Sequence, residues 1–265
     1  MSLSPDIIPF SEISLWAIVF VFASHFLGFV VRGTFGFGSN MPIVLLTTWV
    51  LSPHHAVLLA MLASTVAQIH LFPQGLGTAD WQITRPVAIG QLVGIGIGTW
   101  VFTRLRADWL TLMLGLLICL IVLMDRFKLL ERLERTVNLR SRSVTSFLSV
   151  TSGVVGTVSG GGGMYFLIAY LKLACPTPQA FRGTNLVLSG FFLAGRVIFI
   201  GVVGWVSLKL LVETALLVPV IFLGTWAGTR FFRASSAMRF YTTLQIVLLW
   251  AAIALMGKGI ENFVK

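Results

Sequence analysis

Long runs of hydrophobic residues, separated by short polar connections, extend along most of the chain. A transmembrane helix needs about 17 to 25 predominantly apolar residues, and seven runs reach or approach that length. They are Leu15–Val31, Ala56–Phe72, Pro86–Phe102, Trp109–Met124, Leu186–Val206, Leu210–Gly228 and Tyr241–Met256. The short alternating segments of a transmembrane β-barrel are absent from the sequence. The pattern predicts an all-α integral membrane protein.

Composition agrees with this fold class. Of the 265 residues, 57% are hydrophobic and 11% are charged, whereas a soluble domain carries about 25% charged residues. So few charges cannot cover a water-exposed surface, so we expect most of the surface to face lipid. The N-terminal stretch lacks a basic region and contains Asp6 and Glu12, so we expect a retained first helix and no cleaved signal peptide.

The basic residues, which give a net charge of +10, cluster most densely in one polar connection. Six of the nineteen lie in Asp125–Arg142, together with three acidic residues. Basic loops usually mark the cytoplasmic side of a membrane protein. Apolar residues recur at helical spacing in the same segment, so we expect residues 127–142 to form an amphipathic cytoplasmic connection at the lipid surface. We expect contact with lipid headgroups and no binding of nucleic acid.

One sequence pattern occurs twice. The segment Gly33–Pro53 aligns without a gap on Gly156–Pro176, at an offset of 156 − 33 = 123. The identical pairs are Gly33 and Gly156, Thr34 and Thr157, Gly38 and Gly161, Met41 and Met164, and Pro53 and Pro176. Later, GIGT ending at Thr99 aligns with WAGT ending at Thr229. We therefore predict two homologous membrane repeats, 12–126 and 143–258, with an N-terminal stretch 1–11 and a C-terminal tail 259–265.

Each repeat has a glycine-rich break followed by a short apolar piece, Met41–Leu51 or Met164–Cys175, that is too short to span a bilayer. We predict about eight transmembrane helices, with one Gly-rich broken helix in each half. Broken helices at matching positions of two halves are typical of a transport site at the repeat interface. An odd number of crossings per half would make the repeats inverted and an even number would make them parallel; the sequence leaves both open.

The glycine breaks are the main candidate binding sites. Glycine lets the backbone leave the helix, and the open amides at the start of the next helix favour an anion. Close packing of small residues is the alternative, and it suits GIGIGT and GTWAGT well. The substrate-binding candidates in the two breaks are Thr34, Gly36, Gly38, Ser39, Asn40, Ser159, Gly160, Gly161 and Gly162.

Two arginines in the second half are further candidates. Arg182 and Arg196 are 14 residues apart, or about 21 Å along a helix, so both cannot contact one small anion. An arginine fork suits an oxyanion, and the alternative is a side chain that extends to the membrane surface. Thr184 and Asn185 are candidate ligand donors, with helix capping as the alternative.

Glu213 and His25 are candidates for proton coupling, because both lie in apolar runs. The alternatives are an ion pair of Glu213 with Lys209 and a core role for His25. Neither Cys119 nor Cys175 has a metal-ligand spacing around it. We expect no metal and no cofactor.

The duplicated Gly-rich break, the TN of PTPQAFRGTNL (176–186) and its counterpart AMLAST (60–65) resemble the sulfite exporter TauE/SafE family. The resemblance covers nearly the whole chain. It implies a multi-pass protein of the cell (inner) membrane that acts as a secondary transporter and exports sulfite, organosulfonates or related small anions. A homodimer is left open. The first half departs from the glycine-rich pattern, because Ser39 and Asn40 stand where the second half has Gly162 and Gly163.

Three other functions remain as alternatives. Import or export of other small organic anions would use the same site. An intramembrane serine enzyme would use Ser159, but GTVSG is one residue too long for the nucleophile motif and the second half has no histidine base. A membrane scaffold without transport would leave the matched breaks unexplained. We therefore do not expect an enzyme.

Overall fold

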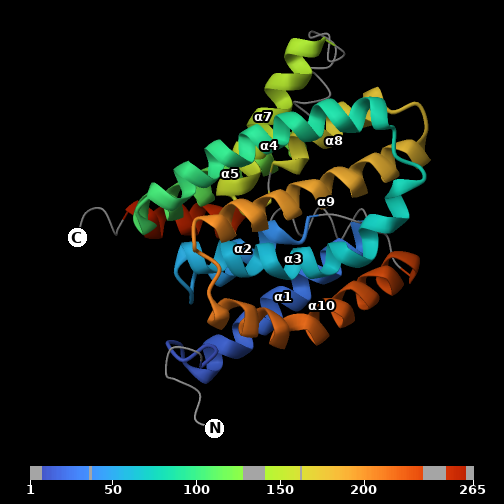
Figure 1. Ribbon diagram of the computed structural model, residues 1–265. Helices are drawn as coiled ribbons and strands as arrows, with labels where there is room; N and C mark the ends of the chain where they lie inside the picture. Colours follow the sequence, from blue (N-terminus) through green and yellow to red (C-terminus); the bar gives the residue numbers. More distant parts are fainter. Residues whose placement is uncertain (1–7, 36–37, 128–140, 162, 235–248, 261–265) are drawn as a thin grey trace.

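The computed structural model describes residues 8–35, 38–127, 141–161, 163–234 and 249–260, and these residues form helices and connecting turns without a β-strand (Figure 1). The helices are α1 (Leu15–Phe35), α2 (Asn40–Thr47), α3 (Pro53–Leu76), α4 (Trp81–Arg104), α5 (Ala107–Arg126), α7 (Arg142–Val158), α8 (Met164–Ala174), α9 (Pro178–Val202), α10 (Leu208–Ala234) and a last helix, Leu249–Ile260.

Six helices, α1, α3, α4, α5, α9 and α10, are long and apolar enough to cross a bilayer. They coincide with six of the seven predicted hydrophobic runs, and α9 begins earlier than its run because Pro178 starts it under a Thr177 cap. The seventh run lies partly outside the described residues, and so does most of the basic connection, 128–140. The chain is thus a multi-pass helical membrane protein.

One end of the bundle, called here the first end, holds the start of α3, the start of α10 and the end of α4. His54 of α3 lies 3.2 Å (Nε2) from the carbonyl oxygen of Phe102, and its ring is 5.1 Å from that of Trp205, just before α10. Lys209 Nζ lies 2.8 Å from Glu12 Oε1, beside the start of α1. Helix α1 therefore also begins at the first end, which lies on the left in Figure 1.

The opposite end, called here the second end, holds the turn from α3 to α4 and the start of α9. The backbone amide of Asp80 donates to Thr184 Oγ1 at 2.9 Å. Helix α8 ends just before α9, and its Tyr170 hydroxyl lies 3.4 Å from Thr145 Oγ1 near the start of α7. Helices α7 and α8 therefore leave the second end and return to it. Helices α1 and α2 do the same at the first end, because α2 leads directly into α3.

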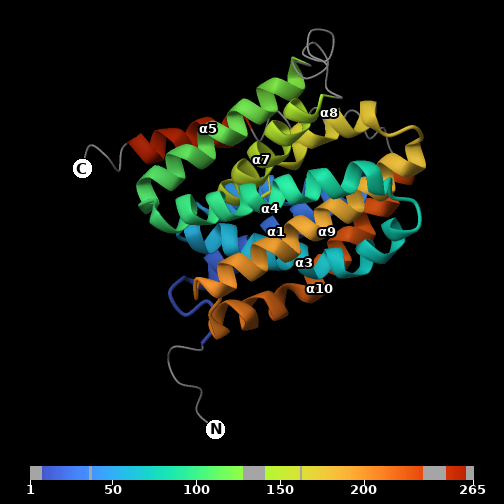
Figure 2. The same ribbon diagram turned by 45° about the horizontal axis from the view of Figure 1, so that its top comes forward.

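Two pairs of long helices pack along each other, α1 with α10 and α4 with α7, while α9 lies alongside α3 and α4 (Figures 1 and 2). The backbones approach closely where glycines meet. A Cβ at Gly33 would overlap the carbonyl of Thr225, and a Cβ at Gly94 would overlap that of Val150. Small residues thus act as packing devices at these two crossings, as the alternative interpretation of GIGIGT and GTWAGT predicts.

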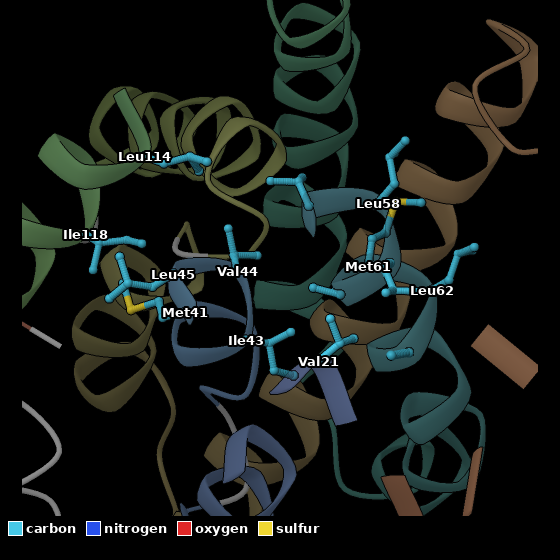
Figure 3. Close-up of a cluster of buried hydrophobic side chains, with 14 of the residues drawn as sticks. Val21, Met41, Ile43, Val44, Leu45, Leu58, Met61, Leu62, Leu114 and Ile118 are labelled. Atoms are coloured by element: carbon cyan, nitrogen blue, oxygen red, sulfur yellow. The ribbon is translucent and has the colours of Figure 1, made fainter. Parts of the chain in front are cut away.

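The short helix α2 lies inside the protein. Met41, Ile43, Val44 and Leu45 are all at most 2% exposed. Figure 3 shows them among core side chains that include Leu58 and Met61 of α3 and Leu114 and Ile118 of α5. The long helices instead turn large apolar residues outward, as lipid contact requires. Irregular backbone beside α2 is therefore surrounded by protein, the condition under which it is tolerated at membrane depth.

Candidate functional site

A cluster of polar side chains, called here the polar cluster, surrounds the start of α2. Arg32 comes from the last turn of α1, Ser39 and Asn40 from the start of α2, and Ser64 and Gln68 from α3; all are at most 9% exposed. Buried polar groups are costly unless they have partners. The contacts within the cluster therefore decide what it can bind.

Arg32 is held by two of these neighbours. Its Nη2 donates to Gln68 Oε1, and its Nη1 lies 3.5 Å from Ser39 Oγ. Gln68 is itself fixed, because its Nε2 donates to the carbonyl of Leu186 in α9 at 2.8 Å. Arg32 Nε has no hydrogen-bond partner in the described part of the chain. The guanidinium is thus oriented but retains binding capacity.

Asn40 joins the two glycine-rich segments. Its Nδ2 donates to the carbonyl of Gly160, and its Oδ1 accepts from Ser39 Oγ at 3.1 Å and from Ser64 Oγ. Gly161 lies directly beside it, so that a Cβ there would be 2.7 Å from Asn40 Nδ2. The tip of the α1–α2 hairpin therefore touches the tip of the α7–α8 hairpin.

The backbone at these tips needs glycine. Gly38, Gly160 and Gly161 have φ angles of 89°, 80° and 137°, a region that residues with a Cβ rarely adopt. After Gly38 the chain enters α2 through Ser39, whose side chain makes no cap hydrogen bond. The first amides of a helix have no intrahelical acceptor and carry a partial positive charge. The start of α2 thus adds to the positive potential of Arg32.

No carboxylate among the described residues balances the charge of the buried arginines. Arg32 is 7% exposed and Arg196 is 0% exposed, and neither forms an ion pair within the described residues. The one buried acid among these residues, Glu213, is engaged elsewhere. An isolated cation out of water is strongly unfavourable. A bound anion would supply the missing charge.

Arg196 lies in the interior of α9 and does not extend to the membrane surface. Its Nη2 donates to the carbonyl of Thr157 at 2.9 Å, and its guanidinium carbon is 5.8 Å from the centre of the Phe192 ring. Its Nε and Nη1 are buried and have no partner in the described parts of the chain. Arg182, by contrast, is exposed at the second end.

Two other predicted site residues make local contacts. Thr34 Oγ1 donates to the carbonyl of Val30 at 2.8 Å and to that of Gly228 at 3.2 Å, which ties α1 to α10. Ser159 Oγ donates to the carbonyl of Val155 at 2.6 Å. These contacts account for both hydroxyls as parts of the helix framework. Gly36 and Gly162 lie outside the described residues.

The TN pair after the proline turn divides into two roles. Thr184 Oγ1 accepts the amide of Asp80, so it fixes the α3–α4 turn at the second end. Asn185 is 8% exposed, and its Oδ1 has no partner within the described segments. Asn185 directly precedes Leu186, whose carbonyl holds Gln68. Asn185 is therefore adjacent in sequence to a residue that contacts the polar cluster, whereas Thr184 is engaged at the α3–α4 turn.

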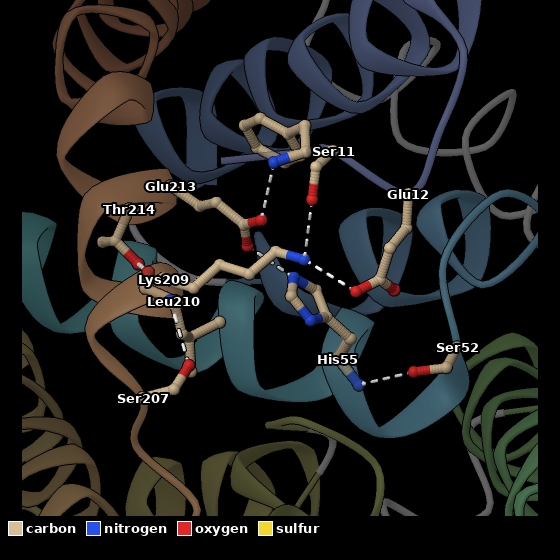
Figure 4. A network of polar contacts seen from close by, with 10 residues as sticks. Ser11, Glu12, Ser52, His55, Ser207, Lys209, Leu210, Glu213 and Thr214 are labelled. Atoms are coloured by element: carbon tan, nitrogen blue, oxygen red, sulfur yellow. Dashed lines mark hydrogen bonds and ion pairs between the residues drawn. The ribbon is translucent and has the colours of Figure 1, made fainter. Parts of the chain in front are cut away.

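Glu213 does not pair with Lys209, the alternative to proton coupling that its helical spacing offered. Lys209 pairs with Glu12, while Glu213 lies 2.6 Å (Oε2) from His55 Nε2 and accepts the amide of Phe10 at 2.9 Å (Figure 4). Helical spacing could not predict the contact of Glu213 with Phe10, because the two residues are 203 positions apart in sequence.

His25 has a local contact as well. Its Nδ1 lies 2.8 Å from the carbonyl oxygen of Val21, one turn earlier in α1, and the ring is fully buried. Within the described residues, no group of three or more His, Cys, Asp or Glu side chains could hold a metal ion.

Sequence reasoning missed Arg32, Ser64 and Gln68. The signal was present: Arg32 directly precedes the first glycine break, and Ser64 and Gln68 are four residues apart in an apolar run, which places them on one helix face. The first predicted hydrophobic run, Leu15–Val31, ends just before Arg32.

A multi-pass helical bundle in which a buried polar cluster with one arginine lies between two helical hairpins is typical of membrane transporters. The family model described as "Sulfite exporter TauE/SafE" matches residues 20–255 of the 265. The chain therefore belongs to the sulfite exporter TauE/SafE family, which is a family of membrane transporters. Neither the search of curated proteins nor the search of solved structures found a match.

Proposed function

We propose that this protein is a secondary transporter that exports small sulfur-containing anions, such as sulfite or organosulfonates, and binds them between its two glycine-rich segments. Membership of a transporter family supports the general function. The polar cluster supports the anion. In this proposal Arg32, Ser39 and Asn40 line the site from the first half, and Gly160 and Gly161 from the second.

The observation that carries the proposal is the unpaired charge of Arg32. This cation is buried beside the open amides of α2 and has no carboxylate partner among the described residues. A guanidinium presents parallel N–H donors that suit the paired oxygens of sulfite or a sulfonate. The neighbouring Ser39 and Ser64 hydroxyls offer further contacts to an oxyanion.

The arrangement of the helices supports alternating access. The α1–α2 hairpin enters from the first end and the α7–α8 hairpin from the second, and α1 packs with α10 as α7 packs with α4. These relations suit two inverted repeats, 12–126 and 143–258, with about eight membrane helices in all. Rocking of one repeat against the other would open a site between the hairpin tips to either side in turn.

Glu213 is our candidate for proton coupling, with His55 as its partner in place of Lys209. Glu213 is buried and His55 is part-exposed at the first end, where a proton entering from one side of the membrane would reach the pair. His25 is a weaker candidate, because its Nδ1 is already bound to the backbone.

Binding measurements on purified protein in nanodiscs test the proposal. We expect sulfite to bind wild-type protein, and Arg32→Gln to bind it about 10- to 100-fold more weakly, since a charge-assisted hydrogen bond contributes about 1.5–3 kcal/mol. Arg32→Lys should be intermediate, because it keeps the charge and loses the fork. The exposed Arg104→Gln is the matched control and should bind normally.

A panel of sulfite, sulfoacetate, taurine and acetate then identifies the substrate class. Preference for sulfite and sulfoacetate over acetate supports a sulfur oxyanion. Equal binding of acetate would favour the alternative of a general organic-anion transporter. If no anion of the panel binds the wild-type protein, the proposal is wrong.

A further inference from the structure

We propose that the transport path contains a second anion site at Arg196, separate from the Arg32 site and on the other side of the hairpin-tip contact. This inference rests on the proposed function, because it describes where the same substrate binds next. The two sites would be occupied at the same time at saturating anion concentration.

Arg196 has the properties of an unfilled anion site. It is 0% exposed, and only its Nη2 has a partner among the described residues, the carbonyl of Thr157. A structural arginine in the interior of a membrane protein normally uses its donors on carboxylates or several carbonyls. Nη2 carries two hydrogens and uses one of them on Thr157, so its other hydrogen still forms a two-donor edge with Nε or with Nη1, which is the geometry that accepts two oxygens of one oxyanion.

The surroundings of Arg196 add a second uncommitted group. Gly98 of α4 packs against Thr157, so that a Cβ there would be 2.8 Å from Thr157 Cβ. The next residue, Thr99, is 2% exposed, and its Oγ1 has no partner in the described part of the chain. Two residues of this region, on α9 and α4, thus carry buried hydrogen-bonding groups without partners.

The positions along α9 separate the Arg196 site from the Arg32 site. Gln68 links Arg32 to the carbonyl of Leu186 in α9, and Arg196 follows Leu186 by 196 − 186 = 10 residues on the same helix. Ten helical residues rise about 15 Å. A sulfite or sulfonate group spans only a few ångströms, so this backbone separation favours two positions for the anion along the path.

The two sites lie toward opposite ends of the protein. Helix α9 runs from the second end to the first end, so Leu186 and the Arg32 site are nearer the second end and Arg196 is nearer the first end. The contact of Asn40 with Gly160 joins the hairpin tips, and we place it between the two sites. One site can thus face each side of the membrane while the tips stay closed.

This arrangement has a consequence for release. A single tight site releases its anion slowly. With two neighbouring sites, an anion that arrives at the first site repels the anion bound at the second site and speeds its release. Arg32 would receive the anion from the second end, and Arg196 would pass it to the first end.

The experiment is the number of anions bound per chain, measured by equilibrium dialysis of radiolabelled sulfite against protein in nanodiscs. We expect two per chain for wild type, one for Arg32→Gln, one for Arg196→Gln and none for the double variant. The exposed Arg104→Gln should keep two. Arg196→Lys retains the charge, so it should still bind two anions, the second one more weakly. If Arg196→Gln does not fold, Arg196→Lys takes its place in the experiment.

The outcomes separate this inference from the proposed function. One sulfite per wild-type chain, lost in Arg32→Gln and kept in the Arg196 variants, overturns the second site and leaves the proposed function intact. No sulfite bound to wild-type protein overturns both. One site that is lost in either single variant also overturns the inference, because it would mean that both arginines serve one position.

Discussion

At the scale of single residues, the two predicted halves of this protein carry different side chains where their glycine-rich segments meet. The sequence shows Asn40 aligned with a glycine of the second half, which looked like a weakened copy of the motif. The structure gives a physical reason: the missing side chain of Gly161 leaves the space that the Asn40 amide occupies. The Asn40 side chain thus requires a residue without a Cβ at position 161. The sequence alone does not show this requirement, because the two positions are far apart along the chain.

A substitution at Gly161 tests this contact. Gly161→Ala would add a Cβ 2.7 Å from Asn40 Nδ2 at a φ of 137°. We expect a loss of about 1–3 kcal/mol from backbone strain alone, and weaker anion binding because Asn40 must move. Thermal unfolding in detergent measures the first effect and sulfite titration the second.

The control for that variant is Gly201→Ala. Gly201 lies in α9, and a Cβ there would meet no atom within 4 Å. We expect unchanged or slightly higher stability, since alanine is the better helix former. Equal stability of the two variants would show that the Gly161 backbone is not constrained as the structure indicates.

At the scale of elements, the hydrophobic pattern predicts the long helices well and their partners poorly. Six runs became six long helices because burial in lipid depends on length and composition, which are local properties. The pattern could not show that α1 and α2 return to the same end. It also could not show that the N-terminal segment binds α10, because these contacts join distant residues.

The link between the N-terminal segment, α3 and α10 predicts a stability effect. Glu213→Ala leaves the amide of Phe10 and the His55 ring without their partner. We expect a loss of about 1–3 kcal/mol, the cost of leaving buried polar groups unsatisfied. A lower midpoint of thermal unfolding is the measurement.

Glu12→Ala is the matched control. Lys209 lowers the pKa of Glu12 through a hydrogen bond and its charge, so their pair is fully formed at neutral pH and is lost as the pH falls through that lowered pKa. Glu12 is exposed, however, and exposed ion pairs contribute little. A Glu12→Ala effect as large as that of Glu213→Ala would contradict the assigned role of Glu213.

At the scale of the whole molecule, the positions of the helix ends support our proposal of inverted repeats, which the sequence left open. The sequence predicts a duplication through Gly33 and Gly156, but the number of crossings per half depends on whether a short helix re-enters or spans. That choice is set by tertiary contacts at the tips, such as Asn40 with Gly160, and not by hydropathy.

The topology has a direct test by cysteine labelling. The free cysteines Cys119 and Cys175 are first replaced by alanine, and Ser52→Cys or Thr177→Cys then marks the start of α3 or α9. We expect a membrane-impermeant maleimide to label the two positions from opposite sides of oriented vesicles. Labelling of both from the same side would mean that the repeats are parallel.

If Arg32, which has no carboxylate partner among the described residues, binds the transported anion, a carboxylate placed beside it should displace that anion. Gln68→Glu places one on the atom that already contacts Arg32 Nη2. It should weaken sulfite binding at least about tenfold, because a fixed ion pair replaces the anion. The control is Gln74→Glu, which adds the same charge to an exposed position of α3 and should leave binding unchanged. The measurement is sulfite titration of the two folded variants. Equal sulfite affinities of Gln68→Glu and Gln74→Glu would contradict the binding of the anion at Arg32.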